Sequence, residues 1–283
     1  MGPVISTDEA LRLLSGGSPP VMLDVRWRLT GPSGRADHEA GHLPGAVFVD
    51  LDNELADPAG SGGRHPLPNP TALQESLRAA GVCAGRPVLV YDADNGSVAA
   101  RAWWLLRWAG HEHVRVLDGG YAAWVSEQRP VSTDQPSPER GDFEVVGGHM
   151  PVVELDRVGS LAREGTLLDA RAPERYRGET EPIDPRAGHV PGAVNAPFTG
   201  HIDEYGRWRS PEELADRFRA LGVDESRPVA AYCGSGVTAC SVLLAWEQAG
   251  LSREGDRPAL FPGSWSQWSS DPGRPAATGA EPG

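Results

Sequence analysis

Short apolar runs alternate with longer amphipathic stretches along most of the chain. The apolar runs at residues 21–25, 88–91 and 114–117 have the length of buried strands. The stretches at residues 71–80 and 98–109 repeat apolar side chains at helical spacing. Strands that alternate with helices in this way are typical of a mostly parallel sheet covered by helices on both faces. The pattern therefore predicts the α/β fold class.

The chain also contains an internal repeat. Short blocks in its first half recur in the second half, in the same order and at nearly the same spacing. Chance similarity of apolar strands explains any one block but not an ordered set, so the halves are predicted to be two copies of one α/β domain. The paired blocks are residues 23–26 with 168–171, 41–47 with 188–194, 88–91 with 229–232, and 118–124 with 262–268.

The repeat sets the expected domain boundaries. A chain of 283 residues fits two domains of moderate size. We expect an N-terminal domain at residues 1–130 and a C-terminal domain at residues 149–283. Residues 131–148 are rich in Pro, Ser, Gly and charged side chains and show little periodicity, so they are predicted to be a linker.

The charge of the chain limits its partners. It has 26 Lys and Arg against 39 Asp and Glu, a formal net charge of −13. This excess of acid argues against binding nucleic acid or an anionic membrane surface, and favours small molecules or proteins as partners. A small anionic substrate would need clustered arginine or inward-pointing backbone N–H groups to overcome the long-range repulsion.

The cysteines and the hydropathy indicate a cytoplasmic protein. Cys83, Cys233 and Cys240 are too few and too unevenly placed for a secreted disulfide framework. No apolar run approaches the roughly 20 residues that span a bilayer, and the N-terminus lacks the regions of a signal peptide. No motif specifies an oligomeric state.

The strongest candidate for chemistry is Cys233. It follows the apolar run 229–232 and precedes Gly234 and Gly236, after which residues 240–249 have a helical pattern. Open α/β sheets bind ligands at the carboxyl ends of their strands. Glycines let backbone N–H groups turn inward, and a helix N-terminus adds partial positive charge, which together favour a thiolate and an anion beside it. Cys233 is therefore predicted to be a nucleophile, whereas the alternative for an isolated cysteine is a buried small hydrophobe.

The sequence Cys-Gly-Ser-Gly-Val-Thr at residues 233–238 resembles the active-site loop of rhodanese-family sulfurtransferases. It is similar to the loop of 3-mercaptopyruvate sulfurtransferases, since thiosulfate sulfurtransferases typically carry basic residues directly after the cysteine. The tandem halves, the two Gly-His-x-Pro-Gly-Ala blocks and the closing residues 263–268 extend the resemblance to nearly the whole chain.

This resemblance implies a rhodanese-like fold in both halves and an activity. Sulfane sulfur would pass from 3-mercaptopyruvate or thiosulfate to a thiol, cyanide or thioredoxin-like acceptor through a persulfide on Cys233. Neither a metal nor an organic cofactor is implied, and the Cys and His residues show no metal-ligand spacing.

The resemblance also implies roles for individual residues. Ser235, His65 and Asp52 match the serine, histidine and aspartate that move a proton in the mercaptopyruvate enzymes. Read without the family, His65 in its Gly- and Pro-rich loop is equally compatible with a plain surface residue. Arg175 matches the arginine that grips the donor's carboxylate or sulfonate, and Arg186 is the candidate for a second one, although its spacing differs. The backbone expected to surround the persulfide is that of Gly234, Gly236, Val237, Thr238 and Ala239.

The N-terminal half is predicted to be catalytically silent. Alignment of Tyr91 with Tyr232 puts Asp92 opposite Cys233, and a carboxylate cannot accept sulfur. The repeated pair of Asp24 with Arg26 in this half indicates that Asp169 with Arg171 is a structural ion pair as well.

Two other function classes compete with sulfur transfer. Some rhodanese domains are non-catalytic binding modules, a reading that the presence of Cys233 weakens. Cysteine phosphatases share the fold but need a longer loop that ends in an arginine, and here Ala239 and Cys240 follow Thr238 instead.

Overall fold

The computed structural model describes residues 2–252 and 256–283. The chain forms two compact units. Each unit contains one short segment from the other half of the sequence, namely residues 58–66 in unit 2 and residues 203–208 in unit 1. Unit 1 comprises Met1–Asp57, Leu67–His149 and Asp203–Trp208, and unit 2 comprises Pro58–Pro66, Met150–Ile202 and Arg209–Gly283.

Unit 1 is built on a parallel five-stranded sheet of order β1-β5-β4-β2-β3. Its strands are short and almost wholly buried, which explains their continuous apolar composition. The strands are β1 (Val4–Ile5), β2 (Val21–Asp24), β3 (Val47–Phe48), β4 (Val88–Tyr91) and β5 (Val114–Leu117), and the helices are α1 (Thr7–Leu14), α2 (Gly34–Ala40), α3 (Leu51–Glu54), α4 (Pro70–Ala79), α5 (Ala99–Trp108) and α6 (Gly120–Ser126).

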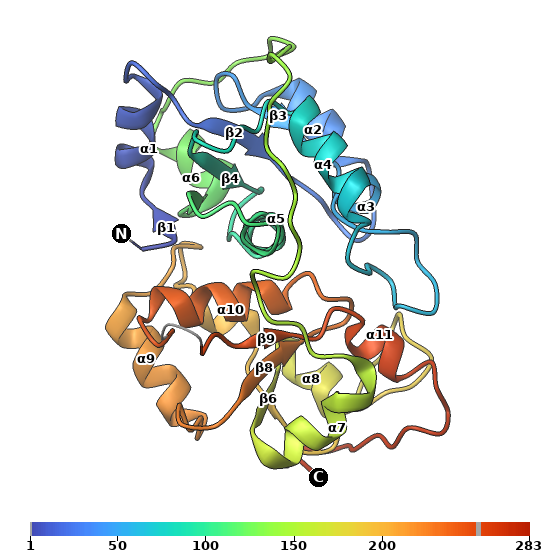
Figure 1. Cartoon of the computed structure of the whole chain (residues 1–283). Helices are drawn as coiled ribbons and strands as arrows, with labels where there is room; N and C mark the ends of the chain where they lie inside the picture. The colour runs from blue at the N-terminus through green and yellow to red at the C-terminus, as the bar shows by residue number, and fades with distance from the viewer. Residues whose placement is uncertain (1, 253–255) are drawn as a thin grey trace. The chain divides into compact units, whose positions relative to one another are not determined.

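Unit 2 repeats this plan with a parallel four-stranded sheet of order β7-β6-β8-β9. Figure 1 shows α9 and α10 on one side of β6, β8 and β9, and α7, α8 and α11 on the other. The predicted α/β class and its tandem repeat are thus confirmed. The strands are β6 (Thr166–Asp169), β7 (Ala193–Asn195), β8 (Val229–Tyr232) and β9 (Ala259–Leu260), and the helices are α7 (Leu155–Glu164), α8 (Pro173–Tyr176), the 3-10 helix η1 (Phe198–His201), α9 (Pro211–Ala220), α10 (Ala239–Gln248) and α11 (Ser264–Trp268).

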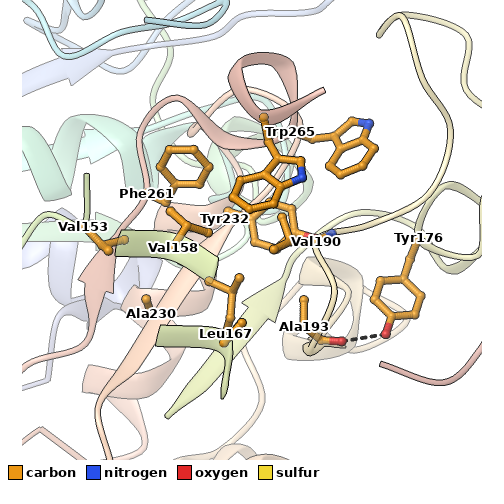
Figure 2. Packing of buried hydrophobic residues seen from close by; sticks show 12 residues of the cluster. Val153, Val158, Leu167, Tyr176, Val190, Ala193, Ala230, Tyr232, Phe261 and Trp265 are labelled. Carbon is orange, nitrogen blue, oxygen red and sulfur yellow. Dashed lines mark hydrogen bonds between the residues drawn. The ribbon is translucent and has the colours of Figure 1, made fainter. Parts of the chain in front are cut away.

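The core of unit 2 joins one face of its sheet to three helices. Leu167, Ala230 and Tyr232 lie on alternate positions of β6 and β8, so they point to the same face. There they pack against residues of α7, α8 and α11, as Figure 2 shows. The Tyr176 hydroxyl donates to the Ala193 carbonyl (2.6 Å), which satisfies the one polar group of a buried ring.

A buried ion pair recurs at the ends of two corresponding strands, β2 in unit 1 and β6 in unit 2. Arg26 binds the Asp24 carboxylate (2.6 Å) and donates to the Gly41 carbonyl (2.7 Å). Arg171 binds Asp169 (2.7 Å) and donates to the carbonyl of Gly188 in the same way. The predicted structural role of both pairs is confirmed, because they tie a strand end to the loop that carries the repeated Gly-His block.

Residues 131–148 follow the surface of unit 1 and are fixed to it at several points. The backbone N–H of Phe143 donates to the Val82 carbonyl (3.2 Å), and the Phe143 ring is buried. Gly141 lies so close to Val82 that a side chain there would collide with its carbonyl. Within the part of the chain that the structure describes, no helix is both long enough and apolar enough to cross a membrane.

His201 is a fully buried histidine whose ring makes no polar contact. It packs against Phe218, and neither ring nitrogen has a hydrogen-bond partner within residues 2–252 and 256–283. Burial, together with the nearby charge of Arg217, lowers the pKa of His201 to about 3. The folded protein therefore keeps this ring neutral where the unfolded chain, with a histidine pKa near ~6.5, would protonate it.

This difference predicts a pH-dependent stability. As the pH falls from about 6.5 toward 3, the unfolded chain gains a proton on His201 that the folded chain does not, so the free energy of unfolding of unit 2 should fall. His201→Phe removes that proton and should flatten the slope by up to about 1.4 kcal/mol per pH unit. Urea unfolding of both proteins across this pH range checks the expectation, and equal slopes would contradict it.

Candidate functional site

Cys233 lies at the carboxyl end of β8, an interior strand of the unit 2 sheet. Its side chain is almost fully buried, at 2% exposure. Residues 234–238 form the loop that follows, and α10 begins at Ala239. The structure thus places the cysteine at the strand-loop-helix junction that the sequence predicts.

The loop after Cys233 turns a backbone N–H group toward the sulfur. Gly236 N–H donates to Cys233 Sγ (3.1 Å). Gly236 adopts a left-handed φ of 80°, and a Cβ atom there would collide with the Pro262 carbonyl, so only glycine fits. The carbonyls of Val237 and Thr238 accept from Cys240 N–H and Ser241 N–H in the first turn of α10.

The start of α11 holds the opposite side of the loop. Trp265 N–H donates to the Cys233 carbonyl (2.9 Å), and Ser266 N–H donates to the Gly234 carbonyl (2.9 Å). Ser264 Oγ accepts from Cys233 N–H (3.1 Å) and donates to the Phe261 carbonyl (2.9 Å). Because these bonds draw the backbone of Cys233 toward α11, the side chain is fixed on the loop side.

Ser264 makes this contact at a conformational cost. Its φ of 53° is left-handed, a region that side chains with a Cβ rarely adopt. The corresponding position in unit 1 is Gly120, whose φ of 54° is the same. The hydroxyl therefore accounts for the presence of serine where the repeat otherwise uses glycine.

His65 and Ser235 meet within unit 2, as the resemblance implies. His65 Nδ1 lies 2.8 Å from Ser235 Oγ, and both residues are buried, at 5% and 8% exposure. The reading of His65 as a plain surface residue is therefore wrong. His65 reaches this place because residues 58–66 pack against α11, where Gln267 Nε2 donates to the Ser61 carbonyl (2.9 Å).

Asp52 belongs to unit 1. It lies in α3, which begins after Asp50 caps the helix by accepting from the N–H groups of Asp52 and Asn53. The Asp52 carboxylate accepts from Trp27 Nε1 (2.9 Å).

Arg175 extends from the short helix α8 toward the Cys233 loop. A Cβ atom built on Gly234 would lie 3.5 Å from Arg175 Nη1, so the guanidinium is next to the residue that follows the cysteine. Two carboxylates hold its Nη2, those of Glu181 (2.6 Å) and Asp184 (3.2 Å).

Arg186 contacts the C-terminal segment. Its guanidinium donates to the carbonyls of Ser269 (3.0 Å) and Arg274 (2.8 Å), and also to those of Trp268 and Asp271. These bonds engage Nε and both terminal nitrogens.

The sequence did not point to three residues near the loop, which are Arg64, Glu181 and Asp184. Arg64 Nη2 would lie 3.2 Å from a Cβ atom on Gly234, and Arg64 Nη1 binds Asp184 Oδ1 (2.8 Å). Glu181 links Arg175 to Arg171. The one available signal was that Arg64 directly precedes His65, so that a loop carrying one also carries the other.

The corresponding loop of unit 1 is occupied by its own carboxylate. Asp92 accepts from the N–H groups of Gly96 (2.9 Å), Val98 (2.9 Å) and Ala99 (3.1 Å). Burial raises the pKa of Asp92, although these three bonds act in the opposite direction. The loop of unit 1 thus holds a carboxyl group through backbone N–H donors.

Residues 2–252 and 256–283 contain no cluster of three or more His, Cys, Asp or Glu side chains placed to hold a metal ion.

Comparisons with known proteins assign the family. Residues 6–127 and 155–271 each match the family described as Rhodanese-like domain. The chain is 43% identical to "Putative thiosulfate sulfurtransferase SseB" of Mycobacterium tuberculosis, over 98% of this chain and 97% of that protein. It is 45% identical to "Probable 3-mercaptopyruvate sulfurtransferase" of Pseudomonas aeruginosa, over 92% of each. The crystal structure of SseA from Escherichia coli, a 3-mercaptopyruvate sulfurtransferase, matches with a TM-score of 0.81 and 30% identity, over 94% of this chain and all of that one.

The chain therefore belongs to the rhodanese family. Within that family it is a tandem-domain sulfurtransferase, an enzyme that takes sulfur from a donor and passes it to an acceptor thiol.

The role of Ser264 can be tested by stability. Ser264→Ala removes the hydroxyl that binds Cys233 N–H and keeps the left-handed backbone, so the free energy of unfolding should fall by about 1–3 kcal/mol. Ser264→Gly loses the same hydrogen bonds but relieves the backbone strain, so it should be about 1 kcal/mol more stable than the alanine variant. Chemical unfolding of the three proteins measures both differences. An alanine variant as stable as the wild type would show that the hydroxyl does not support the loop.

Proposed function

We propose that this sulfurtransferase carries sulfane sulfur on Cys233 as a persulfide, taken from 3-mercaptopyruvate or thiosulfate. The observation that carries the proposal is the Gly236 N–H bond to Cys233 Sγ at the end of a buried strand. This N–H donor stabilises negative charge on the sulfur as it attacks, and no side chain has to move to provide it. After transfer, the same donor, with those of Gly234, Val237, Thr238 and Ala239, would surround the terminal sulfur.

The two donors differ in what leaves. With thiosulfate, the Cys233 thiolate attacks the outer sulfur, the S–S bond breaks, and sulfite departs with the bonding electrons. With 3-mercaptopyruvate, the Cys233 thiolate attacks the thiol sulfur, an S–S bond forms and the C–S bond breaks. Pyruvate departs as its enolate, which must then gain a proton. In both cases an acceptor thiolate, cyanide or a thioredoxin-like protein later attacks the outer sulfur of the persulfide, which returns Cys233 to the thiolate. The kinetics should be ping-pong.

We assign Ser235 and His65 to the protonation of the enolate. Their 2.8 Å contact lets the hydroxyl and the imidazole exchange a proton, and Ser235 lies two residues from the sulfur. Asp52 enters this proposal from the sequence resemblance, as the carboxylate that acts with the histidine.

The donor's anionic end is placed at Arg175. Its guanidinium adjoins Gly234, whereas the guanidinium of Arg186 is engaged by four backbone carbonyls of residues 268–274. A planar guanidinium suits either a carboxylate or a sulfonate.

Unit 1 is proposed to be catalytically silent. Asp92 stands where the repeat requires a cysteine, and its carboxylate already receives the N–H donors that a persulfide would need. With this assignment, the N-terminal domain at residues 1–130 has no sulfur carrier, and catalysis belongs to the domain at residues 149–283 together with His65.

The persulfide predicts a mass change. Incubation with either donor, followed by intact-protein mass spectrometry without reductant, should show a gain of one sulfur, about 32 Da, that cyanide removes. Cys233→Ser should never gain it, and Cys83→Ser should gain it normally. An adduct that persists in Cys233→Ser would place the carrier elsewhere.

The proton relay predicts a difference between donors. Ser235→Ala and His65→Ala should each lower kcat with 3-mercaptopyruvate by about 100-fold, the usual size of a general acid-base contribution. Turnover of thiosulfate should change by less than about threefold, because sulfite leaves without a proton. Steady-state kinetics with both donors makes the comparison. Equal losses with both donors would rule out the relay.

A further inference from the structure

Arg64 is held beside the Cys233 loop by its backbone. Its N–H donates to Ser266 Oγ (3.0 Å), a residue of α11. The preceding Gly63 has a left-handed φ of 99°, and a Cβ atom there would lie 2.6 Å from the Gly263 carbonyl. The chain therefore packs too closely against α11 for Arg64 to be displaced without disturbing the Cys233 loop.

The guanidinium groups of Arg64 and Arg175 converge on one place. The nearest of their nitrogens would lie 3.2 Å and 3.5 Å from the same Cβ atom built on Gly234. Two arginines thus adjoin the residue that follows Cys233, although residue 64 and residue 175 come from different halves of the sequence.

Two positive charges this close repel each other unless a negative charge lies between them. Asp184 provides it, because one carboxylate oxygen binds Arg64 Nη1 (2.8 Å) and the other binds Arg175 Nη2 (3.2 Å). The Asp184 side chain is 2% exposed, whereas those of Arg64 and Arg175 are 23% and 19% exposed. The carboxylate is therefore buried beneath the two arginines, and the guanidinium groups remain accessible to a ligand.

We propose that Arg64 is the second anion-binding residue of the donor site, that it selects for a sulfonate-type head group such as that of thiosulfate, and that Asp184 is its positioning residue. The inference rests on the proposed function of Cys233. One guanidinium satisfies the two oxygens of a carboxylate in a bidentate pair. A sulfonate-type head has a third oxygen, and thiosulfate carries a second negative charge. A second guanidinium therefore increases the binding affinity for thiosulfate more than that for 3-mercaptopyruvate.

Unit 1 contains a counterpart that lacks this function. Residues 206–207 repeat the Gly-Arg sequence of residues 63–64, and Gly206 is also left-handed, with a φ of 74°. Arg207 donates to the Asp118 carbonyl (2.8 Å) and pairs with Glu127. The arginine of this segment thus has a structural role where the adjoining loop has no cysteine, which makes Arg207 a matched control.

The test compares both donors in variants of the full-length enzyme. Arg64→Gln should raise the KM for thiosulfate by about 10–100-fold, the effect of losing a charge-assisted hydrogen bond, while kcat changes little. The KM for 3-mercaptopyruvate should rise by less than about threefold. Arg64→Lys should recover part of the loss, because it restores the charge but not the planar fork.

Asp184→Asn tests the positioning role in the same assay. It should raise the KM for thiosulfate at least as much as Arg64→Gln does, because Asp184 binds Arg175 as well as Arg64, and the double variant should be no worse than Asp184→Asn alone. Arg207→Gln, and Arg177→Gln on the exposed surface, should leave the ratio of the two KM values unchanged.

The outcomes separate this inference from the function on which it rests. Iodoacetamide, a neutral reagent, should alkylate Cys233 at a similar rate in every variant that keeps this cysteine. A similar rate would show that the Cys233 loop is intact. If the wild type gains no sulfur from either donor, the proposed function fails. If the wild type gains sulfur but Arg64→Gln keeps the thiosulfate KM, or raises both KM values equally, this inference alone is wrong.

Discussion

The site of unit 2 depends on a chain of alternating charges that runs from the buried sheet to the partly exposed arginines beside the Cys233 loop. Each carboxylate in it bridges two guanidinium groups, or a guanidinium and the backbone, so no charge is left alone in the interior. Removing one of its buried members strands the partners and costs about 3–5 kcal/mol, far more than an exposed pair is worth. Although burial opposes it, the charge of Asp169 raises the pKa of Arg171, which keeps the deepest cation charged. The chain consists of Asp169, Arg171, Glu181, Arg175, Asp184 and Arg64.

This chain also touches the backbone of the catalytic loop. Arg171 lies over the Trp265 ring, 4.8 Å from its centre, and Trp265 N–H donates to the Cys233 carbonyl. The ion pair that looked purely structural in the repeat is therefore one contact away from the backbone of Cys233. In unit 1 the equivalent Arg26 lies over Tyr121, whose N–H donates to the Asp92 carbonyl. The scaffold has been kept in both copies, while the group at the strand end has diverged.

The sequence predicted the parts of the site that lie in contiguous motifs or repeat between the halves. The strand-loop-helix around Cys233 follows from residues 229–249, and the resemblance supplied Ser235 and His65, which the structure brings together. Asp184 and Arg64 could not be found in this way. Their pairing joins positions far apart in the chain, and it depends on the packing of residues 58–66 against α11. No local pattern of apolar residues encodes such a contact.

Arg186 illustrates the opposite difficulty. The resemblance made it the candidate for a second donor-binding arginine, but side-chain direction depends on what the backbone encounters in three dimensions. Here the C-terminal segment brings four carbonyls to the guanidinium, and these backbone acceptors need a donor once they are shielded from water.

The segments exchanged between the halves change what counts as the catalytic unit. Residues 58–66 leave the N-terminal half and pack in unit 2, where they contribute His65 and Arg64. The helices that follow the exchanged segments both begin with a capping residue and proline, Asn69 with Pro70 and Ser210 with Pro211, which lets the chain re-enter regular structure abruptly. A domain drawn at residues 149–283 alone contains the nucleophile and Arg175 but neither residue of that segment. The proposed sulfur-transfer site of unit 2 therefore takes its components from both halves of the sequence.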